Sequence, residues 1–321
     1  MQKRFIKYLL LSLPLLYIAA SLVWWVKLSS KPVIVYIQPG ASAYEISVKL
    51  KQAGVINSSK FFLLAAKVTG SIKQLKAGTY EISPKESIFE IINMLAKGKA
   101  KYIRITIPEG FTGLQIAKRL SEQGVVNEGA FNKLIKDEKL EGYLFPETYY
   151  FERNMPEVKV INRMLEQFNV HFSSDMKKRA NSMKHMNEKN IVILASIIEK
   201  EARLDAERPL ISAVFHNRLK KHMFLESCAT VLYAIGEHKA TLCYKDLEVN
   251  SPYNTYRHYG LPLGPICNPG MESIKAALYP AGTDDLFFVV SDSGTHSFSK
   301  YYREHLQKKI ERKKIRNKNK K

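Results

Sequence analysis

The glutamate with the most unusual surroundings in this sequence is Glu199, which follows a long apolar stretch. Apart from Ser196, residues 191–198 are all apolar, and a helix of this composition is typically buried on every side. On that helix Ala195, Ser196 and Ala202 are the neighbours of Glu199 at i−4, i−3 and i+3. These small residues predict open space for a ligand beside a carboxyl group shielded from water. Such a carboxyl group is suited to acid catalysis near neutral pH.

The same residues have a structural interpretation. Glu199 and Arg203 are spaced to form an i,i+4 ion pair at the solvated end of a core helix. The next acid, Glu201, has larger apolar side chains around it, so the predicted open space does not extend to it. Because charged helix ends are common and catalytic ones are rare, these residues alone favour the structural interpretation.

A second candidate region is residues 251–270, SPYNTYRHYGLPLGPICNPG. It has too many Pro and Gly residues for regular structure and too many aromatic and amide groups for a simple linker. Ordered loops of this kind often line a site, and hydroxyl and amide groups suit the hydroxyl and acetamido groups of sugars. Together with residues of the preceding segment, the candidates for substrate contact are Asn217, Glu226, Ser227, Tyr253, Asn254, Thr255, Tyr256 and Asn268.

Other chemistries fit the sequence poorly. Ser291, Asp292 and His296 supply the residue types of a catalytic triad, but their short separation does not establish its geometry and no GxSxG motif occurs. His216 and His222 lack the HExxH spacing of a zinc helix. No Walker or dinucleotide-binding glycine motif is present, so the sequence predicts no metal and no cofactor.

Six blocks of the second half of the chain resemble a known family. In order, they are LASIIEKEA, ERPLISAVFHNRL, LESCATVLYAIG, SPYNTY, GLPLGPICNPG and SIKAALYPA. They resemble the catalytic domain of the membrane-bound endolytic murein transglycosylases, the YceG-like proteins. One block departs from the pattern, because Glu226, Ser227, Cys228 and Ala229 stand where many members have glutamine, serine, aspartate and proline.

The resemblance implies an enzyme in which Glu199, the first glutamate of the EKE segment, is the catalytic acid. It implies a lytic transglycosylase that cuts the MurNAc-GlcNAc bond of nascent peptidoglycan strands, leaves 1,6-anhydro ends and terminates strand elongation. Asp205, Glu207 and Glu226 are candidate second acids, but the resemblance implies that none is needed. The implied partners are glycan strands and cell-wall synthases. The alternative function is a non-catalytic, membrane-tethered protein that binds peptidoglycan or serves as a scaffold.

The charge of the chain also limits its function. The 321 residues carry a formal net charge of +20. A net charge of +9 lies in residues 300–321, which have eleven basic and two acidic residues and are predicted to form a solvated basic tail. No recognisable nucleic-acid-binding module accompanies this charge, so we expect attraction to an anionic polymer or membrane surface and no nucleic-acid partner.

The amino-terminal region predicts a membrane anchor. Nineteen residues, 8–26, carry no charge, which is enough for one helix across a bilayer. Trp24 and Trp25 continue the apolar run to the interface, which favours an anchor over a cleaved signal peptide. Lys3, Arg4 and Lys7 predict a cytoplasmic amino terminus. We therefore expect a single-pass protein of the cytoplasmic membrane whose remaining residues are extracytoplasmic.

An internal repeat follows the predicted anchor. Residues 37–61 align with residues 107–131 at an offset of 70, with glycines matched at Gly40 and Gly110 and again at Gly54 and Gly124. Each copy predicts a strand, a turn and an amphipathic helix.

Between the copies, the sequence predicts a strand near residues 78–82 and a helix capped by Ser83, with Pro84 at its first position and Glu86 completing a capping box. The first copy with this strand resembles the LysM-like module of the family. The predicted fold class is α+β, divided into a stub and anchor (1–30), a LysM-like module (31–100), a catalytic domain (101–299, of which 101–150 is a joining region with the second repeat copy) and the basic tail (300–321).

Overall fold

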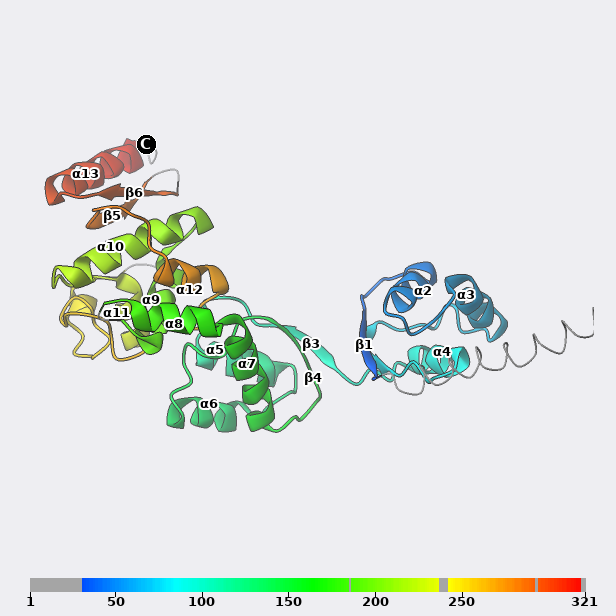
Figure 1. Ribbon diagram of the computed structural model, residues 1–321. Coiled ribbons are helices and arrows are strands. Elements are labelled where there is room, and N and C mark those ends of the chain that lie inside the picture. Colours follow the sequence, from blue (N-terminus) through cyan, green and yellow to red (C-terminus); the bar gives the residue numbers. More distant parts are fainter. Residues whose placement is uncertain (1–30, 185, 237–241, 292–293, 319–321) are drawn as a thin grey trace, which may run out of the picture. The chain divides into compact units, whose positions relative to one another are not determined.

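The computed structural model describes residues 31–184, 186–236, 242–291 and 294–318 (Figure 1). Helices alternate with three small two-stranded sheets, which confirms the α+β class. The chain divides into two compact units, the first ending at Ile105 and also holding Tyr150–Arg153, and the second holding the rest. The predicted membrane anchor lies outside the described residues. Within the described part, no helix is long and apolar enough to cross a bilayer.

The first unit has the order strand, helix, helix, strand, helix. Its elements are β1 (Val33–Ile37), α2 (Ala43–Gln52), α3 (Ser59–Val68), β2 (Gly78–Ile82) and α4 (Ile88–Lys97). β1 and β2 are antiparallel, with Val33 opposite Ile82 and Ile37 opposite Gly78. Alternate residues of the strands turn inward, and Tyr80 is fully buried with its hydroxyl donating to the Lys76 carbonyl at 2.9 Å. The unit therefore has a core of its own.

The start of α4 differs from the prediction. Ser87, rather than Ser83, is the N-cap, and Glu90 rather than Glu86 completes the capping box. Ser83 instead closes a turn, because its carbonyl accepts from the Glu86 amide. Two S-x-x-E patterns compete here, and the one next to the apolar run of α4 prevails because its helix buries Ile91 and Leu95.

The second repeat copy repeats the order of the first. Its elements are β3 (Ile103–Thr106), α5 (Gly113–Glu122), α6 (Glu128–Asp137) and β4 (Thr148–Phe151). The matched glycines adopt the same left-handed backbone, with φ of 80° at Gly40 and 75° at Gly110, and 72° at Gly54 and 68° at Gly124. A glycine is favoured at these turns because residues with a Cβ rarely adopt such a backbone. β3 pairs with β4, and the boundary between the two units passes through both strands.

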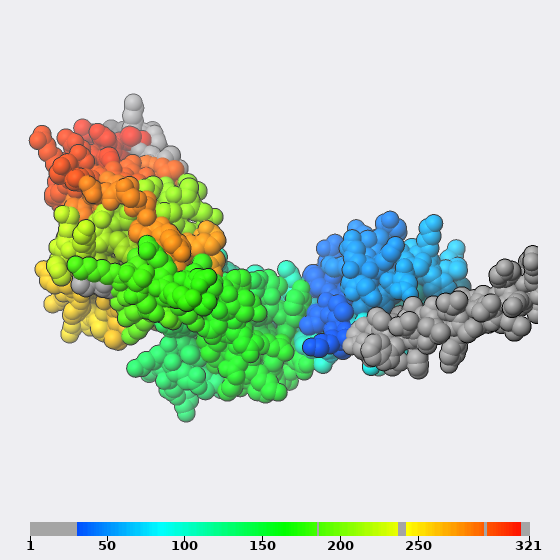
Figure 2. Space-filling model, viewed as in Figure 1, coloured from blue at the N-terminus to red at the C-terminus, as the bar shows by residue number. Residues whose placement is uncertain are grey.

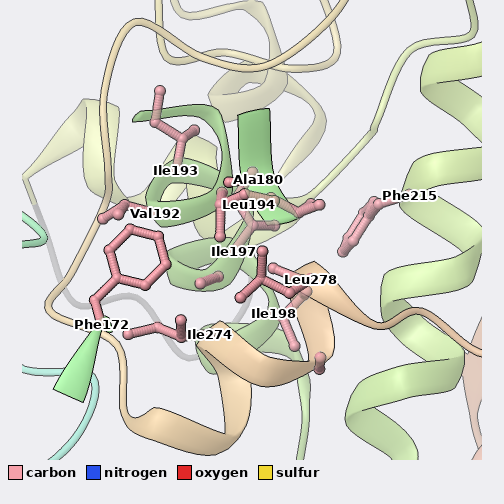
Figure 3. Packing of buried hydrophobic residues seen from close by; sticks show 14 of the residues in the cluster. Phe172, Ala180, Val192, Ile193, Leu194, Ile197, Ile198, Phe215, Ile274 and Leu278 are labelled. Carbon is pink, nitrogen blue, oxygen red and sulfur yellow. The ribbon is translucent and has the colours of Figure 1, made fainter. Parts of the chain in front are cut away.

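The core of the second unit surrounds α9 (Glu188–Glu201). Eight consecutive residues, 191–198, are buried, which confirms the prediction of a helix enclosed on all sides (Figure 3). The helices that pack against α9 are α8 (Ser174–Ser182), α10 (Arg208–Lys220), α11 (Cys228–Ile235) and α12 (Met271–Leu278). Phe172, Phe215 and Leu278 reach this core from outside α9.

The remaining elements complete the second unit. They are α7 (Glu157–His171), the short 3-10 helices η1 (Asp205–Glu207) and η2 (Tyr244–Glu248), β5 (Phe287–Val290), β6 (His296–Ser299) and α13 (Tyr302–Lys318). The basic tail is not simply solvated, because it continues as α13, which packs on the hairpin of β5 and β6 and forms an outer surface (Figure 2). His305 on this helix is buried against the ring of Phe287, with the ring centroids 5.3 Å apart.

Candidate active site

Glu199 lies in the last turn of α9, and its side chain is 7% exposed. Its Oε2 accepts a hydrogen bond from the Gly270 amide at 3.0 Å and lies 3.3 Å from Nη1 of Arg208. The predicted pairing with Arg203 does not form, because the helix ends at Glu201 and Ala202 has an extended backbone with ψ of 136°. Arg203 is therefore no longer one helical turn beyond Glu199, and Arg208 takes its place.

Arg208 is held in a fixed position beside the carboxyl group. It is the first residue of α10, and only 10% of its side chain is exposed. Its Nε donates to Asp205 at 2.9 Å, and its Nη1 donates to the hydroxyl of Ser273. A guanidinium group is always charged in proteins, so Arg208 places a positive charge 3.3 Å from Oε2 of Glu199.

The small residues beside Glu199 leave room for residues 266 and 267 to pack against α9. Ser196 Oγ accepts from the Ile266 amide at 3.0 Å, and the Ser196 carbonyl accepts from the thiol of Cys267 at 3.3 Å. The space predicted for a ligand at this position is thus filled by the segment that leads to Gly270. Small side chains on α9 allow this segment to approach closely enough for its backbone to bind the carboxyl group.

A second acid that the sequence analysis did not identify, Glu109, lies next to this site. Its carboxyl group occupies the position that a Cβ on Gly270 would take, so a side chain there would require Glu109 to move. Burial and then the negative charge of Glu199 raise the pKa of Glu109. The repeat does not mark this residue, because Pro39 stands at the matching position of the first copy.

Glu201 points to different partners. It accepts from Ser227 Oγ at 2.6 Å, and burial raises the pKa of its carboxyl group. Ser227, a predicted substrate contact, is 2% exposed and is used here to hold Glu201. Glu226, another such residue, has φ of 51° and forms an ion pair with Arg218 at 2.8 Å.

Three of the predicted substrate contacts are asparagines whose amide groups are already engaged. The Nδ2 of Asn217 donates to the carbonyls of residues 283 and 285, and that of Asn254 donates to the carbonyls of residues 247 and 249. Asn268 makes four hydrogen bonds, accepting from the amides of residues 142 and 144 and donating to Phe111 and Glu141. An amide nitrogen has two hydrogens, so none of the three can donate to a sugar in this arrangement. They hold loops together instead.

The other predicted contacts divide between buried and accessible positions. Thr255 is 1% exposed and accepts from the Ser227 amide at 3.1 Å. Tyr256 is partly exposed, with its hydroxyl 3.2 Å from the thiol of Cys228. Tyr253 lines a pocket of about 910 Å³. Tyr253 and Tyr256 are therefore the predicted contacts whose aromatic side chains a ligand can reach.

Glu141, also missed by the sequence analysis, lies at the same pocket. Its carboxylate accepts from the Gly113 amide at 3.0 Å and from Asn268 Nδ2 at 2.9 Å, with the Tyr233 hydroxyl at 3.4 Å. Burial raises its pKa to about 7, and these hydrogen bonds oppose the rise. Through Asn268, this carboxyl group supports the segment that binds Glu199.

The aromatic residues that follow Glu141 pack against helix α7. Phe145 is 4% exposed and stacks on His171 with ring centroids 4.3 Å apart, while Tyr143 meets Phe168 edge-on at 5.1 Å.

No cluster of three or more metal-ligating side chains occurs within the described ranges.

Comparison with known proteins identifies the family of this chain. The model of the YceG-like family matches residues 35–311, which includes both units. The chain belongs to the YceG-like family. It is 37% identical to the endolytic murein transglycosylase of Bacillus subtilis, over 91% of this chain and 88% of that protein. It is 30% identical to that of Streptococcus pneumoniae, over 81% of this chain but only 54% of the longer relative.

A solved structure gives the same result. The crystal structure of a YceG-like protein from Listeria monocytogenes is 36% identical and has a TM-score of 0.60, covering 87% of this chain and 99% of that one. The family resemblance predicted from the six sequence blocks is thus confirmed.

The raised pKa of Glu141 predicts a specific pH dependence of stability. The unfolded group has a pKa near 4.5 and the folded group about 7, so the folded protein holds the proton more tightly between these values. The stabilisation from that proton is present at low pH and is lost as the pH rises to 7, and it amounts to the order of 2–3 kcal/mol. Glu141→Gln removes this titration, so the stability of the variant relative to wild type should rise between pH 5 and pH 8.

Urea unfolding of both proteins at several pH values measures this difference. Lys118→Gln, an exposed position on helix α5 outside this pocket, is the control, and its stability relative to wild type should not follow the same pH profile. A difference between Glu141→Gln and wild type that stays constant with pH would show that Glu141 does not titrate in this range.

Proposed function

We propose that the chain is an endolytic murein transglycosylase, which cleaves the β-1,4 bond between N-acetylmuramic acid and N-acetylglucosamine in peptidoglycan. The observation that carries the proposal is Glu199 at the end of a fully buried helix, held on one oxygen by Arg208 and the Gly270 amide, in a chain of the YceG-like family. The curated relatives from Bacillus subtilis and Streptococcus pneumoniae are named for this activity.

The two oxygens of Glu199 are suited to different tasks. Oε2 is held by Gly270 and Arg208, whereas no hydrogen bond within the described part of the chain involves Oε1. In the first step, Oε1 carries the proton and donates it to the glycosidic oxygen, so that N-acetylglucosamine leaves as an alcohol. Anchoring one oxygen keeps the other in a fixed direction.

In the second step, the ionised carboxylate acts as a base. It takes the proton from the 6-hydroxyl of the same muramic acid residue, and that oxygen closes onto C1 to give a 1,6-anhydro ring. The nucleophile belongs to the substrate, so the reaction benefits from the high effective molarity of a positioned group and consumes no water. Arg208 supports this step because its charge stabilises the carboxylate.

Three other candidate acids are bound to partners within the protein, so they are not available as a second catalytic carboxyl group. Asp205 binds Arg208 at 2.9 Å, and Glu226 binds Arg218 at 2.8 Å. Glu207 accepts from both the backbone amide and the ring of His296, the latter at 2.7 Å. A mechanism with one carboxyl group as acid and then base fits this arrangement.

The cellular setting of the proposal follows from the sequence and the family resemblance. Residues 1–30 would anchor the chain in the cytoplasmic membrane, and the catalytic domain would act on the extracytoplasmic side. There, cleavage of nascent strands beside cell-wall synthases would end their elongation. The first unit would serve as a LysM-like module that keeps the enzyme close to the polymer.

Glu199→Gln should reduce the cleavage of peptidoglycan strands by roughly 10²–10⁴-fold, because the amide keeps the shape of the side chain but cannot donate the proton. Purified glycan strands and mass spectrometry of the released fragments measure this loss. Glu188→Gln, in the first turn of the same helix α9, is the matched control and should retain full activity. Full activity in Glu199→Gln, with both variants folded, would exclude this residue from the chemistry, whereas absence of cleavage by the wild type would favour the scaffold function.

Deletion of residues 33–100 should lower activity on intact cell walls more than on short soluble glycans, because only the polymer benefits from a second attachment point. The ratio of the two rates, wild type against deletion, measures the tethering effect. If both rates fall by the same factor, the first unit has a structural role and does not bind the wall.

A further inference from the structure

The pocket beside Glu141 lies entirely within the second unit and has the dimensions of a ligand site. Its volume of about 910 Å³ is in the range of roughly 300–1,000 Å³ typical of small-molecule pockets. One side is formed by α6 and the residues after it, and the other by Tyr233, Tyr253 and residues 263–265. The rings of Tyr233 and Tyr253 are 4.9 Å apart and give the pocket an aromatic wall, a surface that proteins use to stack sugar rings.

The rim of the pocket is positively charged. Four lysines lie along the rim: Lys133, Lys136, Lys139 and Lys189. Within the described residues, none of these four lysines forms an ion pair. All four are exposed, and Asp137 is the acid that accompanies them at the rim. Lys139 follows the C-cap of α6 with φ of 55°, the left-handed conformation that commonly ends a helix. The rim therefore attracts an anionic group.

One residue that lines the pocket carries a hydrogen-bond acceptor without a donor. Asn132 Oδ1 is buried and has no hydrogen-bond partner among the described residues. A buried polar atom without a partner costs free energy, and a donor can satisfy this one only if the side chain rearranges. The carboxylate of Glu141 differs, because protein donors already satisfy it.

One chain segment connects this pocket to Glu199. Residues 263–265 line the pocket, the next residue, Ile266, donates to Ser196 on α9, and Gly270 donates to Glu199. Asn268 of the same segment is bonded to Glu141 at the pocket. The pocket and Glu199 are thus contacted by the two ends of one segment, residues 263–270.

We propose that this pocket is a subsite for a sugar that carries an acidic peptide: the tyrosines contact the ring, and the lysines bind the carboxylates of the peptide. The inference rests on the proposed function, since it names the part of the peptidoglycan substrate that the enzyme selects. It assigns a preference for peptide-bearing strands with free carboxylates over strands whose carboxylates are amidated or whose peptides have been removed.

Calorimetric binding to the full chain carrying Glu199→Gln tests the subsite without turnover. The probes are disaccharide peptides with free carboxylates and the same molecules with the carboxylates amidated. We expect about tenfold tighter binding of the free form, which corresponds to roughly 1.4 kcal/mol shared between two or three exposed ion pairs. Lys133→Gln combined with Lys136→Gln should abolish this preference. Lys118→Gln combined with Lys159→Gln, two exposed lysines on α5 and α7 outside the pocket, should leave it intact.

Equal binding of the two probes, or a preference that survives in the Lys133→Gln and Lys136→Gln protein, would overturn the subsite. Cleavage by the wild-type chain is measured separately on strands with and without peptides. A charge preference in binding without any cleavage would support the subsite and refute the proposed catalytic function. Cleavage without a charge preference in binding would refute the subsite and support the proposed catalytic function.

Discussion

The complete burial of α9 is the constraint on which the rest of the second unit depends. Burying a large aliphatic side chain contributes about 1.5–3 kcal/mol, and residues 191–198 include six of them. Four other helices are needed to cover this one, and they bring distant segments to its end. The helix emerges from the core at Glu199, so the direction of this side chain is set by the same packing that stabilises the unit. A catalytic group on such an element is positioned without a flexible loop.

The second element of the site is the segment that ends at Gly270. It can approach α9 because Ser196 is small and accepts its backbone amide at 3.0 Å. It is held from the other side by Asn268, whose four hydrogen bonds reach the region of Glu141. The loop has little regular structure, yet the side-chain amides of Asn254 and Asn268 and several of its backbone amides are hydrogen-bonded. Its irregular sequence therefore serves to place a single backbone N–H on the carboxyl group of Glu199.

Features that depend on neighbouring residues could be predicted from the sequence, and features that depend on distant contacts could not. The burial of α9 and the repeat with its paired glycines were predicted from local sequence patterns, and the structure confirms both. Ser83 was the wrong cap because a second capping box lies four residues later. Arg208 replaced Arg203 because the helix ends before Arg203. Glu109 and Glu141 were missed because they reach the site across 90 and 127 residues of chain, a distance that no local pattern reports.

The central claim is that one carboxyl group, Glu199, serves as acid and base while the substrate supplies the nucleophile. Glu109 makes this claim open to direct challenge, because a second carboxyl group beside the first could activate water instead. Digestion of purified glycan strands in oxygen-labelled water distinguishes the two reactions by the mass of the released muramic acid end. The account predicts a 1,6-anhydro end that contains no labelled oxygen. A reducing end that carries the label would contradict it and show that the enzyme is a hydrolase.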